Sequence, residues 1–142
     1  MGKTVTIEVL GVDKIVKDIQ TVAQANRFKR EISLCTAIVE STAKSLCPKD
    51  TGRLVNSIHM SVREDGVNTV GKVSTNVEYA PYVEFGTGQR GAQSNYEKAA
   101  ELGLSYSSTK AGQVAQPYMY PALKRNEQSI KKRLEDAIRN EI

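Results

Sequence analysis

Apolar and polar residues alternate over residues 3–10, which is the pattern of a strand with one buried face. The buried face of this strand would carry Val5, Ile7 and Val9. After Gly11 the apolar residues recur every three or four positions, so residues 12–23 are predicted to form a short amphipathic helix that covers the strand.

A longer helix is predicted over residues 26–46. Asn26 is suited to the N-cap, and Pro48 ends the helix because proline cannot continue it. One face of the helix carries an apolar stripe made by Phe28, Ile32, Cys35, Val39, Thr42 and Leu46. We therefore expect this helix to pack along its whole length on the core.

The cluster from Pro48 to Gly52 predicts a turn, and the pattern after it predicts a strand over residues 54–63. Glu64-Asp65-Gly66 is a hairpin signal, and a return strand over residues 68–79 would place Val73, Val77 and Tyr79 inward. With a short piece before Pro117, the sheet would have about four antiparallel strands. A last helix over residues 121–140 completes a predicted α+β fold, and 142 residues is the length of one domain, 1–142.

Residues 86–116 differ from the rest because they are rich in glycine, serine and glutamine and lack a sustained apolar period. Residues 95–102 could form a short helix, which Gly103 would weaken. A loop of this length in a small domain is usually functional or disordered, so we predict a long flexible loop.

Composition excludes some classes of protein. No apolar run is long enough to span a membrane, and the first residues are not those of a signal peptide, so we expect the chain to stay in the cytoplasm where it is made. Cys35 and Cys47 are too far apart along one helix to bond to each other, and a buried reduced thiol is expected at both. With one histidine in the chain, we expect no metal site and no cofactor.

Two short motifs could indicate chemistry. Asp50-Thr51-Gly52 is the tripeptide of retroviral-type aspartic proteases, but a helix end and Lys49 precede it instead of an apolar strand, which favours a structural turn with Gly52 left-handed. Gly86 to Gly91 matches the Gly-x-Gly-x-x-Gly pattern of dinucleotide sites. No carboxylate and no second strand follow at the required distance, so we interpret these glycines as hinges of a mobile loop.

Other polar residues also favour structural roles. Pro81 separates Glu78 from Glu84, so we expect salt bridges from them and not an acid–base pair. His59 falls on the polar face of its strand and is expected to be solvated. Aromatic residues gather on both sides of residues 86–116, where some would complete the core and others would lie at a contact between subunits.

Three segments in this order resemble the gp-ten-like family of head–tail joining proteins from long-tailed bacteriophages. The first is Pro48 to Leu54, followed by Ser57-Ile58. The second is Tyr79 to Thr87, and the third is Pro117 to Ala122, which opens the last helix. These motifs cover about the last two thirds of the chain, and Tyr120 stands where the family often has arginine.

The resemblance implies a non-enzymatic virion protein similar in fold to tail-terminator proteins. Such a subunit would form a hexameric ring that caps the head-proximal end of the tail tube, docks to the neck protein below the portal and lets genomic DNA pass. By this resemblance we expect Asp50, Thr51 and Gly52 to form a structural turn. We expect the contacts with other subunits to involve Glu78, Tyr82, Glu84, Phe85, Gly86, Thr87, Arg90, Tyr118 and Tyr120.

A different class of function is a small basic nucleic-acid-binding protein. The net charge is +4, and basic residues cluster at 27–30 and at 131–133. Duplex affinity that falls steeply with salt would indicate this alternative. The chain offers no aromatic and basic residues in alternation and no recognition-helix motif, so a solvated helix face explains both clusters better.

Overall fold

The computed structural model describes residues 5–9, 22–50, 52–65 and 68–139 of the chain. Its order is β1 (Val5–Val9), α2 (Val22–Leu46), α3 (Arg53–Ser57), β2 (His59–Asp65), β3 (Asn68–Thr75), α4 (Ala80–Phe85), α5 (Gly88–Gln93), α6 (Glu97–Glu101) and α7 (Met119–Arg139). The predicted α+β class is confirmed. The predicted helix over 12–23 lies outside the described residues, except for its last two, which belong to α2.

The sheet has β3 in the centre, and β2 and β1 pair with it on either side, both antiparallel. Met60 and Ile7 both pair with Val73. The predicted hairpin between β2 and β3 is therefore confirmed, but a fourth strand before Pro117 is wrong. In the part of the chain that the structure describes, the region before Pro117 contributes one isolated bridge, between Thr87 and Gln113.

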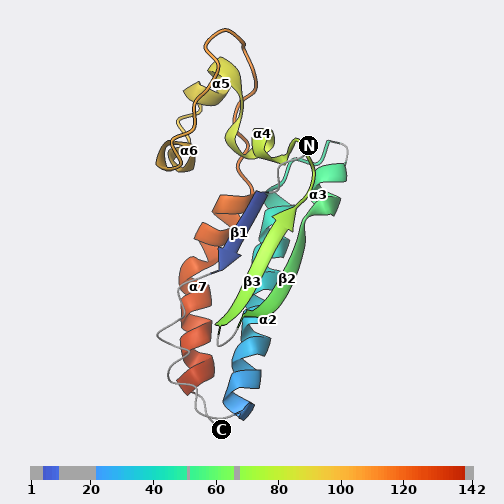
Figure 1. Ribbon diagram of the computed structural model, residues 1–142, viewed down its shortest axis with the longest axis vertical. Helices are drawn as coiled ribbons and strands as arrows, with labels where there is room; N and C mark the ends of the chain where they lie inside the picture. Colours follow the sequence, from blue (N-terminus) through green and yellow to red (C-terminus); the bar gives the residue numbers. More distant parts are fainter. Residues whose placement is uncertain (1–4, 10–21, 51, 66–67, 140–142) are drawn as a thin grey trace.

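Helices α2 and α7 lie side by side behind the sheet (Figure 1), with α2 packed on β2 and β3 and α7 packed on α2 and β1. The core lies between these two layers and is formed mainly by fully buried side chains such as Phe28, Ile32, Val39, Val73, Tyr118 and Leu134. The apolar stripe predicted for the long helix is largely confirmed, although this helix begins at Val22 and not after Asn26. We call this helix–sheet unit the body.

Helix α2 and strand β3 pack closely at Gly71. A Cβ atom on this residue would lie 1.9 Å from the Thr36 Oγ1 atom of α2. Thr36 is fully buried, and its hydroxyl donates a hydrogen bond to the Ile32 carbonyl at 2.7 Å, so it cannot move aside freely. Glycine is therefore required at this position because of the close approach of the helix.

The predicted strand over 54–63 is wrong in its first half, because residues 53–57 form α3. Gly52 adopts the left-handed conformation with φ 75°, and its carbonyl accepts a hydrogen bond from the Asn56 N–H at 3.0 Å. Leu54 and Ile58 are both buried, and a spacing of four fits one face of a helix as well as one face of a strand. The apolar pattern alone could not separate the two structures.

The strand predicted over 68–79 ends at Thr75, and α4 follows with Pro81 in its first turn. Val73 and Val77 are buried, as predicted, and Tyr79 is partly buried against the core.

Cys35 and Cys47 are buried free thiols, which confirms the prediction of buried reduced thiols. Burial raises the pKa of Cys47 to about 11. Both thiols are therefore in the unreactive neutral form at neutral pH.

Candidate interaction surface

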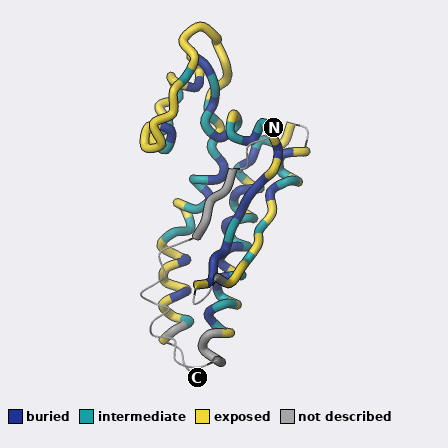
Figure 2. The backbone as a smooth tube through the Cα atoms, viewed as in Figure 1, coloured by how far each residue is buried: buried dark blue, intermediate teal, exposed yellow. Residues whose placement is uncertain are grey.

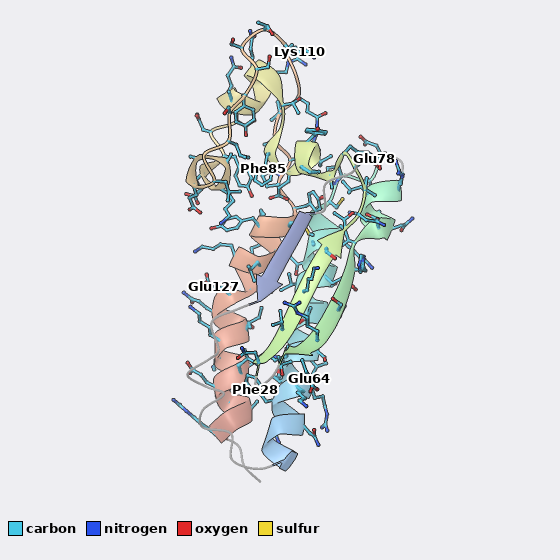
Figure 3. All side chains as sticks on the ribbon, in the orientation of Figure 1. Phe28, Glu64, Glu78, Phe85, Lys110 and Glu127 are labelled. Atoms are coloured by element: carbon cyan, nitrogen blue, oxygen red, sulfur yellow. The ribbon has the colours of Figure 1, made fainter. Side chains whose placement is uncertain are left out.

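Residues 86–116, which we call the arm, extend beyond the end of the body at which α7 begins (Figure 1). The arm contains the short helices α5 and α6 and a long returning segment. Figure 2 shows that most of its residues are exposed, whereas β3 consists mainly of buried residues. In Figure 3, Phe85 lies where the arm leaves the body and Lys110 lies near its far end.

The two backbone segments of the arm are held together by hydrogen bonds. The N–H groups of Thr87 and Gln113 donate to each other's carbonyl oxygens at 2.9 and 3.0 Å. The N–H groups of Gln89 and Arg90 donate to the carbonyl oxygens of Lys110 and Ala111, both at 2.9 Å. The arm therefore has internal order of its own, beyond the single short helix foreseen within it.

Glycines make this close backbone pairing possible. A Cβ atom on Gly112, which has φ 69°, would lie 2.0 Å from the Thr87 carbonyl oxygen. The Gly-x-Gly-x-x-Gly pattern at 86–91 follows helix α4 and not a strand, which is not the context of a dinucleotide site. In this structure the glycines permit contact between backbone segments, a role that differs from the hinges predicted from the sequence.

Glu84 is the central residue at the junction of arm and body. Its side chain is 1% exposed. One carboxylate oxygen, Oε1, accepts hydrogen bonds from the N–H groups of Tyr118 and Met119 at 3.0 and 2.8 Å. The other, Oε2, lies 3.4 Å from the Tyr120 N and accepts a bond from the Tyr96 hydroxyl at 2.5 Å.

The Glu84 carboxylate caps the N-terminus of α7, although Glu84 lies more than 30 residues before this helix in the sequence. A helix start leaves backbone N–H groups unpaired and carries a partial positive charge, so a buried negative charge is favourable there. Pro121, in the first turn, has no N–H to satisfy. The bond from Tyr96 ties the arm to the same carboxylate, and burial together with Glu84 raises the pKa of this tyrosine well above its ordinary value.

Aromatic contacts strengthen the junction. The ring of Tyr96 lies 5.7 Å from that of Phe85 and 6.4 Å from that of Tyr120, between centroids. The Lys98 ammonium lies 4.9 Å from the centroid of the Tyr120 ring. The Tyr106 hydroxyl donates a hydrogen bond to the Phe85 carbonyl at 2.7 Å. The base of the arm is thus fixed on α4 and α7 by several independent contacts.

Exposed apolar side chains gather on the arm and at its base. Among the described residues, the large apolar side chains that remain exposed include three on the arm: Leu102, Leu104 and Val114. Tyr82, on α4 beside it, is 51% exposed. The remaining one, Leu34, lies on α2. A concentration of this kind on one small region is typical of a protein–protein contact.

The residues that the sequence analysis assigned to subunit contacts fall into two groups. Glu84, Gly86 and Tyr118 are buried inside the subunit, so the structure does not place them on an outer surface. Tyr82 and Arg90 are exposed, as is Glu78, whose carboxylate pairs with both terminal nitrogens of Arg53 at 3.0 and 2.9 Å. Phe85, Thr87 and Tyr120 are partly buried at the junction.

Asp50 is exposed, and Thr51 lies outside the described residues. His59 is also exposed, as predicted, with one ring nitrogen 3.0 Å from the Ser57 carbonyl oxygen and the other 3.3 Å from the Ser74 hydroxyl.

Sequence reasoning missed the roles of Tyr96, Leu102, Leu104 and Val114. Their only signal was the presence of large apolar or aromatic residues in a polar segment, where no periodicity assigned them a face.

Within the described residues there is no group of three or more histidine, cysteine, aspartate or glutamate side chains that could hold a metal ion. No described helix is both long enough and apolar enough to cross a membrane.

A family model described as "Bacteriophage HK97-gp10, putative tail-component" matches residues 11–86 of the chain. This match covers more than half of the 142 residues, and the chain belongs to this bacteriophage tail-component family. The match begins well before the motifs noted in the sequence and ends at Gly86. It contains all elements from α2 to α4, includes only the first residue of the arm, and does not include α7. Searches among curated proteins and among solved structures gave no match.

Proposed function

We propose that this tail component is a ring-forming head–tail joining subunit. Six copies would cap the head-proximal end of the tail tube and dock onto the neck protein below the portal. The genomic DNA would pass through the bore without sequence-specific binding. In this proposal the protein is located in the virion and has a structural role without catalysis.

The observation that carries this proposal is the arm. It extends from the body of a phage tail component and holds Leu102, Leu104 and Val114 exposed to solvent. Exposed apolar side chains of this size favour burial against another protein surface, because burial removes them from water. A joining protein needs such a surface outside its own core, so that the subunit can fold before it binds its neighbours.

Exposed residues at the base of the arm would contribute to the ring contact. Tyr82 offers a large amphipathic side chain, which is favoured at interfaces. Glu78 and Arg90 are exposed charges on either side of it in sequence. Glu84 would act indirectly, because its buried carboxylate fixes the direction in which the arm leaves the body.

The test is a variant that lacks residues 92–112, expressed in cells that produce the particle in place of the natural chain. We expect the body to fold, because the core cluster contains no residue of this segment. Heads and tails should then accumulate separately, whereas the natural chain should join them. Circular dichroism and thermal melting of the purified variant check that the body is intact.

Cryo-electron microscopy of the joined particle gives the position of the chain. A six-fold ring of this protein between the portal and the tail tube, with the arm in contact with neighbours, is the expected result. Normal infectious particles from the deletion variant, or density for this chain elsewhere in the virion, would contradict the proposed function.

A further inference from the structure

The end of α6 forms a projecting turn, which we call the knob, made of residues 101–104. The Gly103 and Leu104 N–H groups donate to the Ala100 and Ala99 carbonyl oxygens, both at 3.1 Å, which is the Schellman pattern of a helix end. Gly103 has φ 67°, and a Cβ atom placed on it would meet nothing within 4 Å. The backbone hydrogen bonds of the knob therefore close the turn, and the space beside Gly103 is open.

The knob carries a combination of side chains that suits binding. Leu102 is 54% exposed and Leu104 is 42% exposed. Glu101 stands directly before them and is also exposed, with one carboxylate oxygen 3.3 Å from the Lys98 ammonium. An apolar anchor beside a carboxylate thus projects from the molecule.

A groove of about 480 Å³ lies between the arm and the first turns of α7. Its apolar wall is formed by Tyr96, Val114, Pro117, Tyr120 and Pro121. Lys124 and Arg125 are the basic residues among those that line it, and Glu97 is the acidic one. The Lys124 ammonium lies 3.4 Å from a Glu127 carboxylate oxygen, so Arg125 is the cation that we consider for a partner. The groove is large enough for one or two apolar side chains, and the Arg125 guanidinium beside it would attract a negative charge.

We propose that the groove of one subunit receives the knob of the next copy of this chain. Leu102 would enter the apolar groove, and the Glu101 carboxylate would lie at the rim near Arg125. This inference rests on the proposed ring and names the surfaces by which its subunits meet.

The knob lies beside the groove of its own subunit, because the Glu101 carboxylate is 3.3 Å from the Lys98 ammonium, which lies 4.9 Å from the centroid of the Tyr120 ring in the groove wall. Glu97, at the start of α6, lines the groove, whereas the knob follows the other end of the same helix, about 7 Å along its axis. The two surfaces are made of different residues, and in the proposed ring the knob of each subunit meets the groove of the next, which is a head-to-tail contact. Contacts of this kind build closed rings when the rotation between subunits closes, whereas two identical patches would give a dimer.

Cysteine cross-linking tests whether the two surfaces meet. The natural thiols, Cys35 and Cys47, are 0% and 2% exposed, so they leave a low background. Purified joined particles are made with a mixture of two full-length variants, Leu102→Cys and Arg125→Cys, and treated with a short thiol cross-linker. We expect a linked pair of chains in the mixture and no linked pair in particles made from either variant alone.

The matched control pairs Leu34→Cys with Arg125→Cys, because Leu34 is a leucine of similar exposure on α2, at 47% against 54% for Leu102. This pair should give no linked product. Linkage of Arg125→Cys to a tail tube or neck protein, with none to Leu102→Cys, would overturn the proposal and assign the groove to that partner.

A charge exchange tests the pairing itself. Glu101→Arg and Arg125→Glu should each lower the yield of joined particles by about tenfold, because an attraction at every subunit contact becomes a repulsion. The two changes together should restore the yield to within about twofold, since the pair is present again in reversed order. Lys132→Glu, an exposed α7 cation outside the groove, is the control for net charge and should leave the yield unchanged.

Failure of this inference is distinguishable from failure of the proposed function. If the double variant gives no rescue while particles without the protein remain unjoined, the joining role stands and the knob–groove contact is wrong. If particles without the protein are joined normally, the proposed function is wrong as well. Melting curves of the purified variants confirm that the surface changes leave the fold intact.

Discussion

The body and the arm are stabilised by different interactions. The body buries large side chains between its helices and its sheet, and Val73, Tyr118 and Leu134 are completely buried. In the arm, all of whose residues the structure describes, Ala99 is the only residue with a buried hydrophobic side chain. The arm depends instead on paired backbone groups and on the junction with Glu84.

Because of this difference, the residues that stabilise the fold are not the residues that are exposed for binding. Apolar burial supplies the main free energy of folding, so the body carries the stability of the chain. A region with few buried side chains and exposed backbone hydrogen bonds opens at lower free energy than the core. The arm can therefore expose apolar side chains for a partner while the body remains folded.

The same change in the two regions should have very different effects. Leu134→Ala should lower the free energy of unfolding by about 3–4 kcal/mol, because it leaves a cavity in the core. Leu102→Ala should change it by less than about 0.5 kcal/mol, because the side chain is already in water. Urea denaturation followed by circular dichroism measures both. Equal losses from the two variants would mean that the arm belongs to the stabilising core.

Removing the charge at the junction should have the next largest effect. Glu84→Gln should destabilise the protein by about 2 kcal/mol, because the amide group replaces one acceptor oxygen with a donor among N–H groups that need acceptors. Denaturant unfolding gives the value. Glu40→Gln, which loses a partly exposed charge paired with Lys44, is the control and should have little effect. A loss no greater than that of the control would show that Glu84 does not hold α7.

The bond between Tyr96 and Glu84 connects the two regions, and its loss should loosen the arm more than the body. Tyr96→Phe should cost about 1 kcal/mol, because it removes one hydrogen bond to a carboxylate that keeps its other partners. Hydrogen exchange should become faster in residues 87–116 and remain slow in α2 and β3. Tyr82→Phe is the matched control because its ring is exposed. Faster exchange throughout the body would contradict a local connection.

Alkaline pH should weaken the same junction. Burial and the Glu84 carboxylate raise the pKa of both Tyr96 and Tyr118 in the folded protein. A raised folded-state pKa means that the stabilisation is complete below the ordinary tyrosine pKa of about 10 and is lost as the pH rises above it. Thermal melts between pH 8 and 11 should therefore show a fall that is shallower in Tyr118→Phe. An identical fall in the variant would exclude this tyrosine as a source.

The smallest effect is expected at the surface pair of the body. Hydrogen bonding to Arg53 is the main cause that lowers the pKa of Glu78, so the pair stabilises the protein above the ordinary carboxyl pKa and is lost as the pH falls through the folded value. Glu78→Gln should give a slightly lower melting temperature at pH 7, and its difference from the natural chain should shrink as the pH falls through the folded-state pKa of Glu78. Both side chains are exposed, and salt should abolish even the difference at pH 7.

Much of the body could be predicted from the sequence. The apolar stripe of α2 and the hairpin between β2 and β3 follow periods that local sequence reveals. Helix α3 was mistaken for a strand, because Leu54 and Ile58 satisfy both periods. The composition marked the arm as a distinct segment, but its backbone pairing could not be predicted. A glycine in the sequence indicates that the backbone can adopt unusual conformations, but it does not indicate which segment packs against it.

The sequence by itself determined where the core-facing residues of α2 lie and that residues 86–116 differ in kind from the rest of the chain. Only the tertiary structure decided the role of Glu84, because the N–H groups that its carboxylate caps belong to residues 34 to 36 positions further along the chain. The groove likewise combines residues from the arm and from α7. Periodicity reports which face of an element is buried, whereas a cap or a groove depends on which distant elements that burial brings together.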